Sequence, residues 1–350
     1  MKLLVSAFEH SSNLHLAEVK KRLPSDVEFT GIFDASLGEP LVDLRRLAIM
    51  GFVDALKKLP FFFRLADRML DLAADADKVL LMDASGFNLP LAKKLKKRYP
   101  DKPIVYYILP QAWAWKRRRI GVLTRTVDTL ASILPFERGH YPPDAPITYV
   151  GHPLLDEITR FNDRDSSEIR RVVFMPGSRR GEIRRLMPVF AEVRAALDVD
   201  EALLVVPEHF AKEDLNELYG TLSPFIVTHD AHAALASADF AFICSGTATL
   251  EASLIGTPLV LAYVAKPLDY FLARSLVKLD FIGLANIMFE YVAQRPLHAE
   301  LIQDEVTPEA LLAAMHDTDR TAFAQDAAAL RAYLGHGSAE NVARILMQKE

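Results

Sequence analysis

The chain has 350 residues, enough for two domains of ordinary size, and 51% of them are hydrophobic, which is ample for two cores. A single cysteine, Cys244, excludes an internal disulfide framework and is typical of a reducing compartment. Residues 1–150 carry 23 Lys and Arg against 17 Asp and Glu, whereas residues 151–350 carry 18 against 29. This asymmetry favours an anionic partner for the first half.

Apolar runs of β type alternate with amphipathic segments along most of the chain. In the first half we predict strands at residues 2–8, 28–33, 78–84, 103–109, 129–134 and 147–151. In the second half we predict strands at residues 171–177, 202–207, 225–229, 240–245 and 258–263. Strands that are separated by helices form parallel sheets, so the pattern predicts an α/β fold with two βαβ domains.

A polar stretch at residues 154–170 separates the two series of strands. We therefore predict a first domain at 1–155, a second at 170–306 and a helical tail at 307–350. The tail could pack on its own chain or exchange with a second copy, which leaves both a monomer and a homodimer open. We recognise no signal peptide and no uncharged apolar stretch of about 18 residues, so we expect no membrane-spanning segment.

Small and basic residues follow the strand at 171–177. In an open parallel sheet, ligands bind beyond the carboxyl ends of the strands. Gly177 permits close approach of the backbone, Ser178 is a good N-cap, and Arg179 offers a planar cation that suits phosphate. An ordinary capped helix with a solvated basic face explains this motif equally well.

A second turn, after the strand at 240–245, repeats this design. Ser245, Thr247 and Thr249 place hydroxyl groups around Gly246, where a helix start would offer free N–H groups to an anion. Glu251, in the first turns of the same helix, could accept hydrogen bonds from a ribose diol or could merely complement the helix dipole. Two such turns in one domain favour a nucleotide site.

The first half places acids at the corresponding sheet edge. Asp83 ends a predicted strand and could accept a proton from a substrate hydroxyl, and Glu9 is a second candidate after the first strand. Asn88 begins the next helix, where Asp83 or Asn88 could instead be caps. The segment 44–70 mixes bulky apolar residues with six cations, which favours a helix in the headgroup plane of an anionic membrane.

Other classes of site find less support. G-x-G-x-x-G, G-x-x-x-x-G-K-[ST] and G-x-S-x-G motifs do not occur at the expected positions, and we expect no cofactor. His229 and His232 are too few for a metal site without further ligands, so we expect no metal. The two tryptophans adjoin four successive cations at 116–119, but a nucleic-acid partner needs a broader basic surface than a pI of about 6.1 indicates.

Several stretches together resemble the lipid-A-disaccharide synthase family, which comprises inverting glycosyltransferases with a GT-B fold. The resemblance runs over nearly the whole chain, in the expected order, at residues 87–97, 106–116, 134–137, 149–158, 175–183, 245–263, 283–287 and 300–303. It implies two Rossmann-like domains that face each other across a cleft. It also implies a cytoplasmic protein, peripheral on the inner face of the inner membrane, where it would contact anionic lipid.

The resemblance implies a reaction and a set of site residues. The donor would be UDP-2,3-diacylglucosamine, the acceptor 2,3-diacylglucosamine 1-phosphate, and the products the β-1,6-linked disaccharide 1-phosphate and UDP. Matching positions imply binding of the UDP-sugar by Gly177, Ser178, Arg179, Ser245, Gly246, Thr247, Thr249, Glu251, Asn286 and Gln303. On the acceptor side the matching positions are Ser11, Asn88 and Trp115.

Two departures from the family pattern affect the proposed base. The usual G-E-x-S-G-D loop here reads Phe8 to Asn13, and the second acid of the usual D-x-x-D-F-N is replaced by Gly86. Asp83, with Glu9 behind it, is the remaining candidate. Two alternatives stay open: another GT-B UDP-sugar enzyme, such as a 2-epimerase or a different glycosyltransferase, and a non-catalytic protein that binds nucleotide or lipid.

Overall fold

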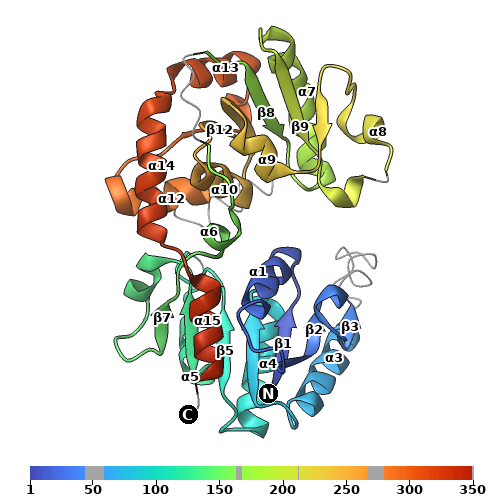
Figure 1. The fold of residues 1–350 in the computed structure, drawn as a ribbon, viewed down its shortest axis with the longest axis vertical. Coiled ribbons are helices and arrows are strands. Elements are labelled where there is room, and N and C mark those ends of the chain that lie inside the picture. Colours follow the sequence, from blue (N-terminus) through green and yellow to red (C-terminus); the bar gives the residue numbers. More distant parts are fainter. Residues whose placement is uncertain (44–58, 115, 163–167, 212, 267–279, 349–350) are drawn as a thin grey trace. The chain divides into compact units, whose positions relative to one another are not determined.

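The structure is a computed structural model that describes residues 1–43, 59–114, 116–162, 168–211, 213–266 and 280–348. The chain forms two compact units (Figure 1). Unit 1 comprises Met1–Glu157 and Leu334–Glu350, and unit 2 comprises Ile158–Tyr333. Both units are α/β, and every strand pairing in the described part of the chain is parallel, as the sequence predicts.

Unit 1 is built on a seven-stranded sheet in the order β3-β2-β1-β4-β5-β6-β7. Its strands are β1 (Lys2–Ala7), β2 (Glu28–Phe33), β3 (Val42–Asp43), β4 (Lys78–Met82), β5 (Ile104–Tyr107), β6 (Thr129–Ser132) and β7 (Ile147–Tyr149). Its helices are α1 (His10–Lys20), α3 (Leu59–Leu72), α4 (Ser85–Arg98), α5 (Arg118–Thr126), α6 (Pro153–Glu157) and α15 (Ser338–Met347), with 3₁₀ turns η1 (Ala35–Leu37) and η3 (Pro135–His140).

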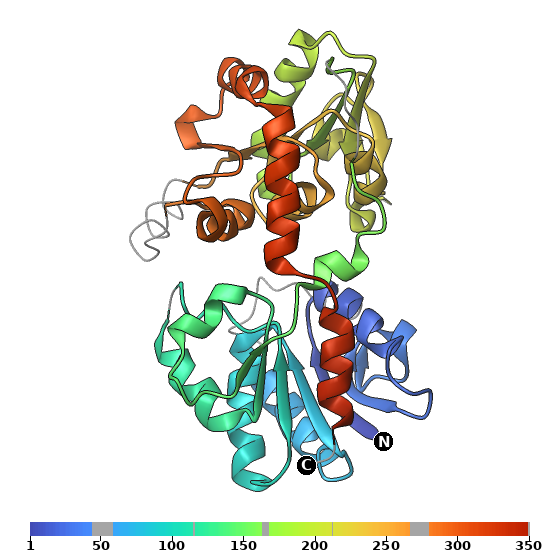
Figure 2. The ribbon, with the colours of Figure 1, turned by 60° about the vertical axis from the view of Figure 1, so that its left-hand side comes forward.

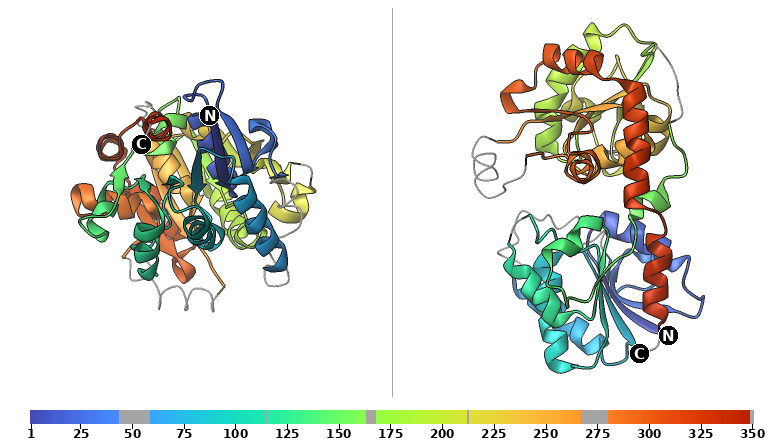
Figure 3. Two further views of the ribbon diagram at one scale, coloured as in Figure 1. Left: turned by 90° about the horizontal axis from the view of Figure 1, so that it is seen from below. Right: turned by 90° about the vertical axis from the view of Figure 1, so that its left-hand side faces the viewer.

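Helices cover both faces of the unit 1 sheet (Figure 3). Successive residues of a strand point to opposite faces, so Leu3 packs toward α1 and α15 while Leu4 packs toward α3, α4 and α5. Because both faces are covered, β1, β4 and β5 are continuous apolar runs rather than alternating ones. This explains why the sequence revealed them.

Unit 2 has a six-stranded sheet in the order β10-β9-β8-β11-β12-β13. Its strands are β8 (Arg171–Met175), β9 (Glu201–Val205), β10 (Ile226–Thr228), β11 (Phe240–Cys244), β12 (Leu259–Tyr263) and β13 (Ala299–Ile302). Its helices are α7 (Arg180–Ala196), α8 (Leu215–Tyr219), α9 (Ala231–Ala236), α10 (Thr247–Ile255), α12 (Leu284–Ala293), α13 (Pro308–Asp317) and α14 (Arg320–Leu334), with η4 (Glu208–Phe210) and η5 (Gln303–Glu305).

The helices after residue 307 do not form a unit of their own. Helices α13 and α14 belong to unit 2 except for the last residue of α14, whereas α15 lies beside the sheet of unit 1 (Figure 2). Asp156 accepts hydrogen bonds from the backbone N–H groups of Gly337 and Ala339, both at 2.8 Å, and thereby secures the start of α15. Tyr107 and Ser338 are hydrogen-bonded at 2.8 Å in the core. The tail therefore packs on its own chain.

Candidate functional site

Each sheet reverses its strand order at one point. In unit 2 the chain runs from β8 outward to β10 and then crosses back to β11, so the turns after β8 and β11 lie at the switch point. In unit 1 the turns after β1 and β4 occupy the same place. Ligands of open α/β sheets bind at such points. We call residues 176–179 with 245–247 the C-terminal half-site, and residues 8–9 with 83–84 the N-terminal half-site.

Gly177 gives the first turn of the C-terminal half-site its shape. Its φ of +110° disfavours any L side chain, and a Cβ built there would lie 2.7 Å from Oε2 of Glu182. Ser178 and Arg179 are exposed beside it. Helix α7 begins at Arg180 with Arg179 in the N-cap position, so the expectation that Ser178 is the N-cap is wrong by one residue.

Glu182 satisfies the start of α7 from within the helix. Its carboxylate accepts the Arg179 backbone N–H at 3.3 Å and the Arg179 guanidinium at 2.8 Å. The hydrogen bond and charge of Glu182 raise the pKa of Arg179. The Arg179 side chain is nevertheless 81% exposed, so its remaining N–H donors face outward beside the turn.

The second turn of the C-terminal half-site is more open. Gly246 is the N-cap residue of α10 with a φ of +145°, and in the described part of the chain no atom lies within 4 Å of a Cβ built there. Ser245 is half-buried, and Thr247 is exposed. Cys244, just before the turn, is buried, and burial raises the pKa of its thiol to about 12.

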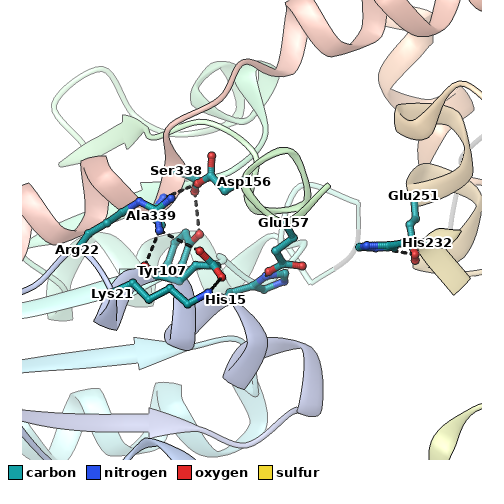
Figure 4. Close-up of polar contacts among 11 residues, drawn as sticks. His15, Lys21, Arg22, Tyr107, Asp156, Glu157, His232, Glu251, Ser338 and Ala339 are labelled. Atoms are coloured by element: carbon teal, nitrogen blue, oxygen red, sulfur yellow. Dashed lines mark hydrogen bonds and ion pairs between the residues drawn. The ribbon is translucent and has the colours of Figure 1, made fainter. Parts of the chain in front are cut away.

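Glu251 has a partner that the sequence did not predict. Its Oε1 lies 2.9 Å from Nε2 of His232, which follows the N-cap of α9 (Figure 4). The Glu251 side chain is 16% exposed and that of His232 is 39% exposed. His229, by contrast, contacts the Val206 carbonyl at 2.7 Å through Nδ1, so the two histidines serve different partners.

Three residues predicted to bind the UDP-sugar make hydrogen bonds within unit 2. Asn286 is fully buried, donates to the His298 carbonyl and Glu300, and accepts the backbone N–H groups of Leu297 and His298. Thr249 is fully buried, and its hydroxyl donates to the Gly246 carbonyl at 2.9 Å. The Gln303 side chain accepts the Ala265 backbone N–H at 2.6 Å. The Asn286 and Thr249 side chains are therefore fully buried and bonded within unit 2, which corrects the direct contact expected of them.

The N-terminal half-site has a strained turn after β4. Asp83 (φ 47°) and Ala84 (φ 36°) are both left-handed although neither is glycine, a conformation that costs about 1–2 kcal/mol per residue. The Asp83 carbonyl accepts hydrogen bonds from Tyr106 and Asn88. Burial raises the pKa of the Asp83 carboxyl, and the charge of His15 partly offsets this effect. Asp83 thus stands at the switch point, where the sequence predicts a base.

Buried asparagines hold both turns of the N-terminal half-site. Asn88 donates to the Met82 carbonyl at 2.9 Å and accepts the Ser6 hydroxyl at 2.6 Å. Asn13 does the same after β1, because it donates to the carbonyls of Ala7 and Glu9 at 3.0 and 2.8 Å. Asn88 is fully buried, so the prediction that it contacts the acceptor is wrong.

Glu9 and Ser11 lie at the start of α1, and both are exposed. A third candidate comes from further along the same helix. The His15 imidazole is hydrogen-bonded through Nδ1 to Oε1 of Glu157 at the end of α6 (Figure 4). These residues are 142 positions apart in the chain, so no local motif could have revealed the pair.

An acid of unit 1 is buried without an ion partner. Glu137, in η3 after β6, accepts the Ser132 hydroxyl at 2.5 Å through Oε2, while Oε1 finds no partner in the described part of the chain. Burial raises its pKa to about 7, and the hydrogen bond from Ser132 opposes the shift. Residues 134–137 are among the stretches that resemble the family, but the sequence does not predict that the Glu137 side chain is buried.

Part of the segment predicted to contact membrane is described. Helix α3 packs Leu65 and Met69 into the core of unit 1, so the apolar residues of its inner face need no lipid to bury them. Phe63 on its outer side is 59% exposed. Residues 44–58 and Trp115 lie outside the described residues.

Among the described residues, no three His, Cys, Asp or Glu side chains gather as metal ligands. Within the same ranges, none of the helices is both long and apolar enough to cross a membrane.

Comparison with protein families gives one match over most of the chain. The model described as "Lipid-A-disaccharide synthetase" matches residues 3–345. The protein named lipid-A-disaccharide synthase from Helicobacter pylori strain G27 is 48% identical to the chain, over 97% of this chain and 96% of that protein. The protein of that name from Campylobacter jejuni strain RM1221 is 43% identical, over 98% of each.

Solved structures that are similar to the chain show its fold. The UDP-GlcNAc 2-epimerase from Neisseria meningitidis aligns with a TM-score of 0.60 at 11% identity, over the full length of both chains. MurG from Acinetobacter baumannii aligns with a TM-score of 0.56 at 13% identity, over 99% of both. With its two parallel sheets and helical C-terminal region, the chain has the GT-B fold.

Proposed function

The chain belongs to the lipid-A-disaccharide synthase family and is a glycosyltransferase of lipid A biosynthesis, and we propose that it transfers the sugar of UDP-2,3-diacylglucosamine to 2,3-diacylglucosamine 1-phosphate. The products would be UDP and the β-1,6-linked disaccharide 1-phosphate, with inversion at the anomeric carbon. The observation that carries this proposal is the pair of glycine-shaped turns at the β8–β11 switch point.

In this proposal the C-terminal half-site binds the UDP part of the donor. The N-terminal ends of α7 and α10 offer backbone N–H groups of the first helical turn and positive dipole ends to the diphosphate. Arg179 adds outward donors, and hydroxyls of Ser178, Ser245 and Thr247 lie on the same turns. These groups stabilise the negative charge that develops on UDP as it leaves.

Glu251 would bind the ribose. A carboxylate accepts two hydrogen bonds from a diol, and His232 holds Oε1 of Glu251 at 2.9 Å. Glu251 sits in the second turn of α10, the helix whose start would bind the diphosphate.

The N-terminal half-site would bind the acceptor. A proton must leave the acceptor 6-hydroxyl as it attacks the donor, and the sequence offers Asp83, or Glu9, at this edge of the sheet. Three aromatic rings adjoin these turns: Phe8 is 4.7 Å from Phe87 and 6.4 Å from Phe62 between ring centroids. Such an apolar cluster suits the acyl chains of the substrate.

The same substrates require contact with a lipid surface, which we propose on the cytoplasmic face of the inner membrane. Phe63 is largely exposed on α3, and Arg64 and Arg68 are exposed on the same helix. Flotation with vesicles tests this contact. Recovery of the protein in solution, both with neutral vesicles and with vesicles that contain acidic lipid, would contradict it.

Incubation of the purified protein with both acylated substrates tests the proposed reaction. Mass spectrometry should detect the disaccharide 1-phosphate in amounts equal to the UDP released. Glu251→Ala should weaken UDP binding in calorimetry, whereas His316→Ala, an exposed histidine on α13, should not. UDP release without disaccharide would instead indicate a different UDP-sugar enzyme, and UDP binding without any turnover would indicate a binding protein.

A further inference from the structure

We propose that the His15 imidazole, oriented by Glu157, takes the proton from the attacking 6-hydroxyl of the acceptor. The inference rests on the proposed function and assigns to His15 the role for which the sequence offered Asp83 and Glu9. His15 lies in the second turn of α1, the helix that follows β1 at the N-terminal half-site. Glu157 closes α6 on the opposite side of the imidazole (Figure 4).

The hydrogen bond between the two side chains sets the tautomer of His15. An ionised carboxylate only accepts, so Nδ1 of His15 must carry the hydrogen that Glu157 binds. The lone pair of the neutral ring is then on Nε2, which has no hydrogen-bond partner among the described residues. A carboxylate on Nδ1 with a free Nε2 is the arrangement of a histidine base in serine hydrolases.

Carboxylates lie near the imidazole that would receive the proton. Glu157 is hydrogen-bonded to His15, and Asp83 is near enough for the charge of His15 to lower the pKa of Asp83 against the larger effect of burial. In the proposed step both carboxylates would attract the imidazolium that forms. The side chains of His15 and Glu157 are only 10% and 14% exposed, so water screens this attraction weakly.

A neighbouring histidine does not compete for the proton. His152 is fully buried beside His15, and burial, with the charge of His15, lowers its pKa to about 3. It therefore stays neutral and adds no like charge. On the other side of the pair, Tyr107 lies near Glu157, whose charge adds to the effect of burial in raising the pKa of the Tyr107 hydroxyl.

Atoms and electrons balance in the proposed step. The acceptor O6–H bond breaks and its proton moves to Nε2 of His15, while the O6 electron pair forms the bond to the anomeric carbon of the donor. The bond between that carbon and the diphosphate oxygen breaks, and UDP leaves with the electron pair. The imidazolium then releases its proton to solvent. In this step Asp83 stabilises the imidazolium and is not itself the proton acceptor.

Three variants separate the roles. His15→Asn keeps an N–H donor for Glu157 but removes the base, and it should lower kcat by about 10²–10⁴-fold. Glu157→Gln should lower kcat by about 10-fold or more, because the amide would donate a hydrogen to Nδ1 and reverse the tautomer. Asp83→Asn should lower kcat by less than His15→Asn does.

Two further readouts keep a structural role distinguishable from a catalytic one. UDP binding, measured by calorimetry, should be unchanged in all three variants, which establishes that the protein is folded. The acid limb of the kcat/KM profile against pH should disappear in His15→Asn, and added imidazole should partly restore the rate of His15→Ala.

The outcomes separate this inference from the proposed function. If the wild type forms disaccharide and folded His15→Asn retains its rate, or if Asp83→Asn loses more activity than His15→Asn, the assignment of His15 is wrong while the reaction stands. If the wild type forms no disaccharide, the proposed function itself fails. His316→Ala is the control variant. Its normal activity would show that removal of a histidine elsewhere in the protein does not lower kcat.

Discussion

The two half-sites occupy the same place in their sheets but are built differently. In the C-terminal half-site the residues with positive φ are Gly177 and Gly246, whereas in the N-terminal half-site they are Asp83 and Ala84. Glycine exposes backbone N–H groups to an approaching anion. A non-glycine residue in the same region presents a side chain instead, at the expense of strain that the surrounding structure must offset.

The surrounding residues explain how each turn tolerates its conformation. Buried Asn88 holds the strained turn of unit 1 by accepting from Ser6 and donating to Met82 and Asp83. In unit 2 the charged pair of Glu182 and Arg179 holds the turn. In the proposed function, one half-site would therefore bind an anion through its backbone, and the other would position side chains for chemistry.

The substitution with the largest expected effect on stability is at Gly177. It tests whether this turn of unit 2 requires glycine. Gly177→Ala would place a Cβ 2.7 Å from Oε2 of Glu182 and force a residue with φ of +110°. Strain and displacement of a buried carboxylate should together lower the free energy of unfolding by about 3–4 kcal/mol, and UDP binding should be lost. Gly86→Ala in α4 is the matched control and should change stability by less than about 1 kcal/mol. Equal effects of the two substitutions, in denaturant unfolding and calorimetry, would contradict the comparison.

The buried acids of the two units should differ in their response to pH. Glu182 is paired, whereas Glu137 has only Ser132 as its hydrogen-bond donor among the described residues. Its pKa rises from 4.5 to about 7 on folding, so the folded state binds more protons between these values. The protein should therefore lose stability, up to roughly 3 kcal/mol, as pH rises from about 4.5 to about 7.

The Glu137→Gln variant separates the effect of Glu137 on the pH dependence of stability from that of His152. His152 has a lowered pKa, so its contribution to stability has the opposite slope and is lost as pH falls below about 6.5. Denaturant unfolding across this range should show that the wild type loses stability relative to Glu137→Gln as pH increases. A constant difference between the two proteins would contradict the raised pKa.

The asparagine that holds the strained turn can be removed directly. Asn88→Ala leaves the Ser6 hydroxyl and the Met82 carbonyl buried without their partner. We expect a loss of about 2 kcal/mol in the free energy of unfolding, together with lower kcat and unchanged UDP affinity. An equal loss of UDP affinity would indicate that the two half-sites are not built independently.

Relief of the backbone strain at Ala84 should raise the free energy of unfolding, whereas the loss of Asn88 should lower it. Ala84→Gly removes the Cβ from a residue with φ of 36° and should raise stability by about 1 kcal/mol. If the strain positions Asp83, kcat should fall even as the melting temperature rises. A more stable variant with full activity would show that the strained turn is dispensable for the reaction.

The smallest expected effect is on UDP binding. It compares the pair of His232 and Glu251 with the pair of His15 and Glu157. His232 is 39% exposed, so its contact with Glu251 is screened by water. His232→Ala should weaken UDP binding only about threefold, or roughly 0.7 kcal/mol, far less than the effect of His15→Asn on kcat. A tenfold or larger loss of UDP affinity would give His232 a direct role in binding.

Most of the fold could be predicted from the sequence. Strands such as β1 and β11 are buried on both faces and therefore appear as continuous apolar runs between turns. Strands β3 and β13 were missed because they are short or partly exposed at the sheet edges. The apolar pattern is a record of burial, so it weakens wherever burial does.

The candidate site was predictable where its signal is local. Gly177 and Gly246 stand next to strand ends, and their conformations depend on neighbouring residues in the chain. Asn88 and Asn286 matched the positions of binding residues, yet their side chains are fully buried and bonded within the protein. Residue type alone does not distinguish an amide that binds a ligand from one that holds a turn.

The sequence by itself determined most of the strands, the glycine turns at the switch point of unit 2 and the acid after β4, since these follow from burial and backbone sterics over a few residues. The tertiary structure alone decided that α15 packs on unit 1, that Glu251 meets His232, and that His15 meets Glu157. These contacts join distant parts of the chain, and their distances depend on how helices pack on a sheet.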